Sequence, residues 1–187
     1  MTLTIPNVLT LLRMGLVPLF IIAVLDGHAE RALLIFLVAG LTDALDGFIA
    51  RFWNQRSLLG AYLDPIADKL LLVSAWVVLS IPSLAKAVTI PLWVTVLVIA
   101  RDVLIVIVGL IFYLAMDVKR FPISLLSKAT TALQVTTLAL VLSSGLWARL
   151  VPVAEALVYV VAVFTLLSGL DYLRRYSRSD EMKARPG

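Results

Sequence analysis

Four aspartates in an otherwise apolar chain are the residues best suited to carry chemistry: Asp43, Asp46, Asp64 and Asp68. An ionisable side chain in a membrane helix costs roughly 2.5–3.5 kcal/mol, and it persists where it faces a bundle interior or a wet cavity. Like charges this close repel one another unless a cation lies between them. Because carboxylate oxygens are ligands that magnesium, manganese and calcium prefer, we expect a divalent-metal site. The alternative is a salt-bridge network with Arg51, Arg56 and Lys69.

The first pair of aspartates has the spacing of one helix face. Asp43 and Asp46 are three residues apart, and Gly47 follows Asp43 by four. Residues three and four apart are neighbours on a helix surface, so carboxylates lie beside bare backbone. A ligand can approach closely at such a place.

The second pair lies beside a predicted helix start. Asp64 precedes Pro65, which suits an aspartate N-cap followed by proline at the first helical position. Asp68 follows one turn later. The sequence therefore predicts that two helix ends present all four carboxylates to one place.

The segment between the two pairs contains residues suited to phosphate binding. Arg51 supplies a fixed positive charge, and Gly47, Ala50 and Gly60 leave the backbone accessible. A pyrophosphate bridged by metal ions needs both features. Small residues also serve helix packing in membrane proteins, and that interpretation stays open for Ala50 and Gly60.

The composition indicates what must position these residues. The chain has 187 residues, of which 61% are hydrophobic and 15% charged. A soluble domain is about 45–50% apolar, so the excess must face a lipid bilayer. We expect an all-α integral membrane protein forming a single domain over residues 1–187, with six transmembrane helices at about 8–25, 32–50, 66–84, 88–116, 129–146 and 153–172.

Basic residues are distributed unevenly among the predicted loops. Ten lie near the loops after the second and fourth spans or in a basic tail at about 174–187: Arg51, Arg56, Lys119, Arg120, Lys128, Arg174, Arg175, Arg178, Lys183 and Arg185. The alternate loops hold only Arg31, Lys86 and Arg149. The positive-inside rule therefore predicts a multi-pass protein of the cytoplasmic (inner) membrane, with both termini and the aspartates facing the cytoplasm.

The residues above form one continuous pattern, D-x-x-D-G-x-x-A-R-(x8)-G-(x3)-D-(x3)-D, which runs from Asp43 to Asp68. This pattern resembles the signature of the CDP-alcohol phosphotransferase family without a gap or substitution. The resemblance extends to Ile5-Pro6-Asn7 near the start and to Ser127-Lys128, Thr130, Thr131 and Gln134 later in the chain.

The resemblance implies a six-helix membrane enzyme, often a homodimer, that uses an alcohol to displace CMP from a CDP-linked lipid such as CDP-diacylglycerol. It also implies two divalent cations, Mg²⁺ or Mn²⁺. Asp43, Asp46 and Asp64 resemble metal ligands, and Asp68 resembles a general base that also contacts metal. The residues that resemble the cradle of the cytidine diphosphate are Asp43, Gly47, Ala50, Arg51 and Gly60.

An acceptor alcohol that carries a phosphate needs cations outside the signature, and the candidates are Lys128, Arg101 and Arg13. Lys128 can reach an anionic headgroup, or it can be an interfacial anchor. Arg101 and Asp102 lie within a long apolar run and are expected to pair with each other or with the site. For both arginines, acceptor binding and an interior salt bridge remain open.

Resemblance to branches of the family favours glycerol 3-phosphate as the acceptor. Asp102 and Ser127-Lys128 differ from that branch and instead resemble the branch that uses phosphatidylglycerol. Inositol phosphate and serine are further alternatives.

Two other classes of membrane protein also use intramembrane acids. Intramembrane prenyltransferases bind pyrophosphate through aspartate-rich motifs, but these normally lie far apart in a longer chain. A cation or proton transporter predicts carboxylates near the midplane and inverted repeats, neither of which is evident. No nucleic-acid partner is expected.

Overall fold

The computed structural model describes the backbone of residues 5–52, 58–116 and 125–183 and the side chains of residues 7–43, 45, 63, 66–107 and 125–171. Within these ranges the chain is helical and contains no strand. The helices are α1 (Ile5–Leu25), α2 (Ala29–Phe52), α3 (Leu58–Leu79), α4 (Leu92–Met116), α5 (Leu125–Ser144), the short 3₁₀ helix η1 (Ala148–Leu150) and α6 (Val151–Lys183).

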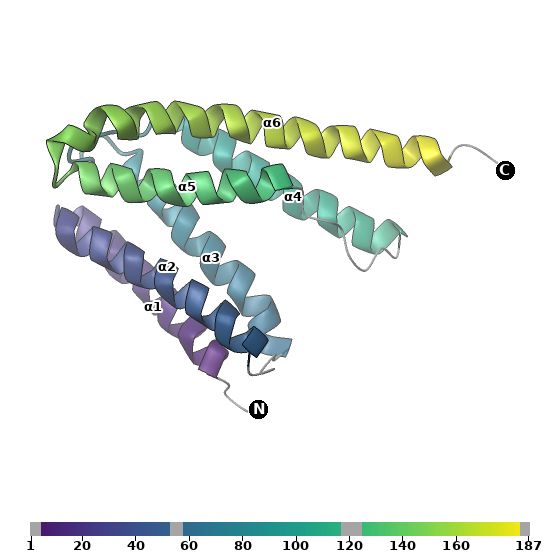
Figure 1. Ribbon diagram of the computed structural model, residues 1–187, viewed down its shortest axis with the longest axis horizontal. Coiled ribbons are helices and arrows are strands. Elements are labelled where there is room, and N and C mark those ends of the chain that lie inside the picture. The colour runs from purple at the N-terminus through teal and green to yellow at the C-terminus, as the bar shows by residue number, and fades with distance from the viewer. Residues whose placement is uncertain (1–4, 53–57, 117–124, 184–187) are drawn as a thin grey trace.

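The helices form two groups that meet at α5 (Figure 1). In the first group, α1 packs against both α2 and α3. In the second group, α6 packs against both α4 and α5, and α5 also contacts α2. Figure 1 shows α5 between α6 and the first group. Side chains from α3, α4 and α5 can therefore converge where the two groups meet.

Each predicted span coincides with one α-helix, and the all-helical prediction is confirmed over the described residues. Within the part of the chain that the structure describes, three helical segments are long and apolar enough to cross a membrane by length and composition: Asn7–Leu25, Leu125–Ser144 and Ala148–Asp171. The three remaining spans stay predictions.

The predicted start of the third helix is wrong. The third helix begins at Leu58, so Asp64 does not cap its start and Pro65 lies inside it. Proline is tolerated inside membrane helices because neighbouring groups can satisfy the carbonyl that it leaves free. The candidate span at Ala148–Asp171 agrees with the predicted span at 153–172, and the helix itself continues to Lys183. At 1.5 Å per residue, α6 is about 50 Å long, which exceeds the hydrocarbon core of about 30 Å.

Buried and exposed residues are distributed as expected for a protein surrounded by lipid. Large apolar side chains such as Leu34 and Leu92 are exposed. Polar side chains on α1 are buried instead, because Asn7, Thr10 and Arg13 follow one another at intervals of three and face the interior. The interior therefore combines an apolar core with a polar stripe that leads to the aspartates.

The turns at one end of the bundle pack together around Lys86. Gly27, in the turn between α1 and α2, has φ of 70°, and a Cβ there would lie 3.0 Å from the Lys86 ammonium nitrogen. A Cβ on Gly145, after α5, would lie 3.1 Å from Cβ of Lys86. Glycine is favoured at position 27 because its backbone is left-handed, a conformation that other residues rarely adopt. Three turns thus meet at the end of the bundle where α2 begins.

Candidate functional site

Two of the four aspartates converge on one buried arginine. Nη1 of Arg13 lies 2.9 Å from Oδ1 of Asp43 and also donates a hydrogen bond to Oδ1 of Asp68. The Arg13 side chain is 1% exposed, whereas Asp43 and Asp68 are 47% and 38% exposed. A guanidinium from α1 therefore holds carboxylates from α2 and α3, and both carboxylates remain accessible from outside.

A cavity of about 120 Å³ lies beside these three side chains. Its walls come from α1, α2, α3 and α5: Arg13, Phe36, Ala39, Gly40, Asp43, Asp68, Leu71, Leu72, Thr131 and Val135. We call it the carboxylate cavity. Its floor is apolar, so electrostatic interactions at its charged edge are screened less than in water.

The remaining signature residues have described backbone but no described side chains: Asp46, Gly47, Ala50 and Arg51 on α2, and Gly60 and Asp64 on α3. Asp46 lies one turn beyond Asp43, and Asp64 one turn before Asp68. Among the side chains that are described, no three metal-binding residues come together.

The described carboxylates fit a divalent cation. Asp43 and Asp68 contact the same nitrogen of Arg13, so their oxygens converge as two ligands of one ion would. Carboxylate oxygens are the donor type that Mg²⁺ and Mn²⁺ prefer.

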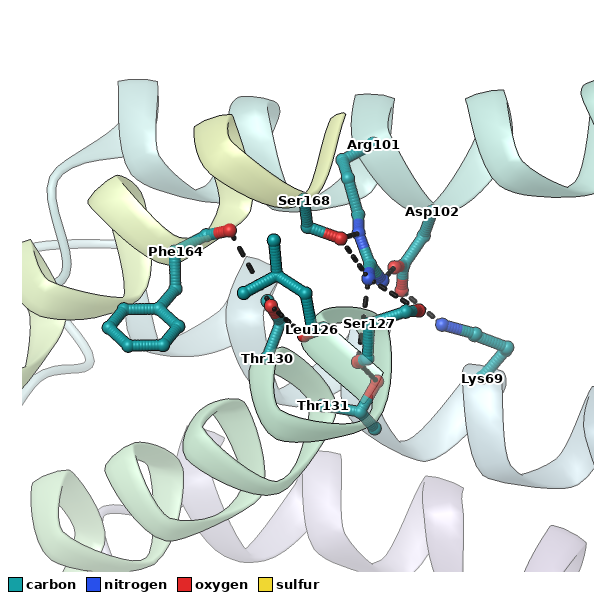
Figure 2. A network of polar contacts seen from close by, with 9 residues as sticks. All are labelled: Lys69, Arg101, Asp102, Leu126, Ser127, Thr130, Thr131, Phe164 and Ser168. Atoms are coloured by element: carbon teal, nitrogen blue, oxygen red, sulfur yellow. Dashed lines mark hydrogen bonds and ion pairs between the residues drawn. The ribbon is translucent and has the colours of Figure 1, made fainter. Parts of the chain in front are cut away.

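A second polar cluster surrounds Arg101 (Figure 2). Arg101 donates to Oδ1 of Asp102 at 2.8 Å, to Oγ of Ser127 at 2.7 Å and to Oγ of Ser168 at 2.7 Å. A further bond of 3.2 Å joins its Nε to Ser168. Arg101 is buried, and these partners lie on α4, α5 and α6. The guanidinium thus joins three helices.

Lys69 connects this cluster to α3. Its ammonium group donates to Oδ2 of Asp102, so Asp102 accepts from both Arg101 and Lys69. Lys69 directly follows Asp68 along α3, and successive residues point about 100° apart around a helix. The two neighbours therefore line different cavities.

The second cavity has a volume of about 400 Å³ and lies among α3, α4 and α5. It is lined by Lys69, Arg101, Asp102, Ile105, Val106, Ser127, Lys128, Thr131 and Ala132. We call it the cationic cavity, because its walls carry three basic side chains and one carboxylate. Such a surface suits an anionic ligand, and Thr131 is common to both cavities.

The candidate acceptor residues separate into two places. Lys128 and Arg101 line the cationic cavity, whereas Arg13 lies with the aspartates in the carboxylate cavity. The prediction that Arg101 pairs with Asp102 is confirmed. In the predicted salt-bridge alternative Lys69 pairs with an aspartate of the signature, but the structure pairs it with Asp102.

The sequence did not indicate a role for Ser168, and it did not indicate that Thr131 lines both cavities. Ser168 is 67 residues from Arg101, and no local pattern connects the two. The signal available in the sequence was a hydroxyl within a long apolar run, because a hydroxyl buried there needs a hydrogen-bond partner.

Comparison with known proteins identifies the family of the chain. Residues 3–167 match the family model described as CDP-alcohol phosphatidyltransferase. The chain is 38% identical over 179 residues to CDP-diacylglycerol–glycerol-3-phosphate 3-phosphatidyltransferase of Escherichia coli (strain K12), covering 92% of this chain and 94% of that protein. The protein of that name from Shigella flexneri shows the same identity and the same coverage of both chains.

A second group of relatives matches over a shorter stretch. The chain is 46% identical over 111 residues to human cardiolipin synthase (CMP-forming), covering 59% of this chain. The match covers 35% of the length of the human protein. Because the family model covers most of the sequence, the chain belongs to the CDP-alcohol phosphatidyltransferase family.

Proposed function

We propose that the chain is a CDP-diacylglycerol-dependent phosphatidyltransferase of phospholipid biosynthesis that uses glycerol 3-phosphate as acceptor and releases CMP, which makes it a phosphatidylglycerophosphate synthase. The observation that carries this proposal is the pair of adjoining cavities, one edged by Asp43 and Asp68 and the other by three basic side chains. The first suits a metal-bound pyrophosphate, and the second suits an anionic acceptor. The relatives that match over nearly their whole length carry the same activity in their names.

The proposed reaction exchanges one bond to phosphorus for another. The acceptor hydroxyl oxygen bonds to the phosphorus of the phosphatidyl group, the bond from that phosphorus to the oxygen of CMP breaks, and CMP leaves with the electron pair. Asp68 accepts the hydroxyl proton, since a carboxylate within reach of the acceptor can act as general base. Its exposure of 38% leaves it accessible to an incoming alcohol.

Asp43, Asp46, Asp64 and Asp68 are the proposed ligands of two divalent cations, Mg²⁺ or Mn²⁺. When bound, such ions supply charge neutralisation of the pyrophosphate and alignment of the leaving group. The proposed nucleotide cradle consists of Asp43, Gly47, Ala50, Arg51 and Gly60. Nη1 of Arg13 contacts both Asp43 and Asp68 and so holds the two carboxylates near each other.

The charge of the cationic cavity supports glycerol 3-phosphate. Lys69, Arg101 and Lys128 face one carboxylate, Asp102, which leaves an excess of two positive charges. A phosphate monoester carries about −1.5 to −2 at pH 7, so the charges balance. Arg101 is buried and its donors are bound to Asp102 and two serines. Lys128 is exposed, and Lys69 has further ammonium hydrogens besides the one bound to Asp102, so these two lysines are the proposed direct contacts.

Phosphatidylglycerol is a second candidate acceptor, which would make the enzyme a cardiolipin synthase. The 46% identity to human cardiolipin synthase supports it. The cationic cavity is also bordered by exposed apolar side chains of α4, including Val106, which suit a lipid acceptor.

The test is to supply the purified protein with CDP-diacylglycerol and Mg²⁺ or Mn²⁺ and to offer glycerol 3-phosphate, phosphatidylglycerol, inositol 1-phosphate or serine separately. Mass spectrometry of the lipids then identifies the acceptor, and the expected product is phosphatidylglycerophosphate together with CMP. Release of pyrophosphate from a prenyl donor would support a prenyltransferase instead. Ion flux without a lipid product would support a transporter.

We further propose that the enzyme lies in the inner membrane with its active site toward the cytoplasm, and that it forms a homodimer. The uneven distribution of basic residues supports the orientation. The dimer rests on family resemblance and is tested by cross-linking in native membranes.

A further inference from the structure

Thr131 is the one residue that lines both cavities among the walls described above. It lies on α5 three residues after Lys128, on the cationic side, and four residues before Val135, on the carboxylate side. These spacings place the three side chains along one helix face. The two cavities therefore adjoin at Thr131, and a molecule that extends from the cationic cavity to Asp68 can pass beside this residue.

The opposite side of this passage is formed by α3. Asp68 borders the carboxylate cavity and Lys69 borders the cationic cavity, although they are neighbours in sequence. An acceptor with its phosphate near Lys69 and its reacting hydroxyl near Asp68 thus reaches around about 100° of the α3 surface. The middle of that acceptor lies opposite Thr131.

The proposed acceptors share the group that would occupy this passage. Glycerol 3-phosphate and the headgroup of phosphatidylglycerol both contain a phosphate, a methylene, a carbon with a secondary hydroxyl, and a terminal hydroxymethyl group. With the phosphate and the terminal hydroxyl placed at the two ends, the secondary hydroxyl comes to the junction.

The Thr131 hydroxyl oxygen can accept a hydrogen bond from that secondary hydroxyl. Its Oγ1 donates to the backbone carbonyl of Ser127 at 3.2 Å, as Figure 2 shows. A hydroxyl that donates one bond still has two acceptor lone pairs. We propose that Thr131 is a positioning and specificity residue, whose Oγ1 accepts a hydrogen bond from the secondary hydroxyl of a phosphoglycerol acceptor and so directs the terminal hydroxyl to Asp68. This inference rests on the proposed function.

The experiment compares two acceptors that differ only in the secondary hydroxyl. Purified full-length protein is assayed with glycerol 3-phosphate and with 3-hydroxypropyl phosphate, at saturating CDP-diacylglycerol. If phosphatidylglycerol is the better acceptor, the pair becomes phosphatidylglycerol and phosphatidyl-1,3-propanediol. The wild type is expected to prefer the hydroxylated acceptor by about tenfold in kcat/KM, the effect of one hydrogen bond.

Thr131→Val keeps the shape of the side chain and removes its hydroxyl. It is expected to reduce the preference to less than about twofold, with the KM for CDP-diacylglycerol unchanged. Thr131→Ser is expected to restore the preference, and Thr131→Ala is a second variant without the hydroxyl. The matched control is Thr136→Val, because Thr136 is exposed on the same helix and makes the same type of bond, 2.9 Å to the carbonyl of Ala132.

Different results would contradict the proposed function and the inference about Thr131. A wild type that forms no lipid from any alcohol contradicts the proposed function and this inference with it. An active wild type with no preference between the two acceptors contradicts the inference alone. If Thr131→Val or Thr131→Ala elutes as folded protein and keeps the full preference for the hydroxylated acceptor, that result also contradicts the inference.

Discussion

At the scale of single residues, Asp68 and Lys69 show how one helix serves two cavities. Asp68 contacts Arg13 beside the carboxylate cavity, and Lys69 contacts Asp102 beside the cationic cavity. Exchanging these two residues in the sequence would place the ammonium group beside the carboxylate cavity and the carboxylate beside the cationic cavity. The order of these two residues therefore gives one cavity a carboxylate and the other a cation, as the proposed roles of general base and anion site require.

Replacing Asp68 with asparagine tests its proposed role as general base. Asp68→Asn keeps the size of the side chain and removes the ability to accept a proton. We expect turnover to fall by about 10²–10⁴-fold while CDP-diacylglycerol still binds. CMP release and binding of the nucleotide lipid are measured on the same preparation, and normal turnover would contradict the assignment.

Arg13 is a fixed positive charge beside the proposed metal ligands. In Arg13→Gln, Asp43 and Asp68 lose their shared partner, so we expect the metal-free protein to lose about 2 kcal/mol of stability. The same loss of positive charge should strengthen Mg²⁺ binding, seen as a lower Mg²⁺ concentration for half-maximal thermal stabilisation. Arg31→Gln, an exposed arginine near the start of α2, is the control. An unchanged Mg²⁺ midpoint in Arg13→Gln would contradict this account.

Lys128 is the exposed cation of the cationic cavity. Lys128→Met keeps the aliphatic length and removes the charge. If Lys128 binds the acceptor phosphate, the KM for glycerol 3-phosphate should rise by about tenfold, as expected for the loss of one charge-assisted hydrogen bond. Lys86→Met, at the other end of the bundle, should leave this KM unchanged. An equal KM for Lys128→Met and the wild type would indicate an interfacial anchor.

At the scale of helices, the sequence was a good guide to the number of helices and a poor guide to where some of them begin. Apolar length identified each helix, because a membrane span needs about 20 apolar residues. The start of α3 was misplaced because Asp64-Pro65 has the chemistry of a helix cap, whereas the helix continues through it. Six residues of α3 precede Asp64, so the local cap chemistry does not determine where the helix begins.

The candidate site was predictable only where its residues share one short segment. The spacing from Asp43 to Asp68 indicated metal and phosphate chemistry directly. The contacts of Arg101 with Ser127 and Ser168 join residues 26 and 67 positions apart. Such contacts depend on how α4, α5 and α6 pack, and helix packing in a membrane leaves little periodic signal in an apolar sequence.

Ser168 is expected to hold α6 against α4. Its Oγ accepts bonds from two nitrogens of Arg101, so Ser168→Ala leaves part of a buried guanidinium without a partner. We expect a loss of about 1–3 kcal/mol in the free energy of unfolding, measured in detergent by tryptophan fluorescence. Ser143→Ala is the control, because the bond described for Ser143 is to the carbonyl of Ala139 within its own helix. Equal stability of the two variants would contradict a role for Ser168 in joining the helices.

At the scale of the whole molecule, the two ends of the bundle differ in chemistry. Lys86 brings together the turns at one end, near Gly27 and Gly145. Asp43 lies 14 residues after Ala29 on α2, about 21 Å away along the helix. The carboxylates therefore lie toward the opposite end, and the positive-inside rule predicts that this end faces the cytoplasm.

The absence of cysteine from the sequence makes this orientation directly testable, since single cysteines can be introduced without removing any. His28→Cys places a thiol in the turn before α2, and Ser179→Cys places one near the end of α6. In spheroplasts, a maleimide that cannot cross membranes should label His28→Cys, whereas Ser179→Cys should be labelled only after the membrane is opened. The wild type serves as the unlabelled control. Labelling of Ser179→Cys in sealed spheroplasts would contradict the predicted orientation. The carboxylate cavity would then face away from the cytoplasm, where the proposed substrates CDP-diacylglycerol and glycerol 3-phosphate are found.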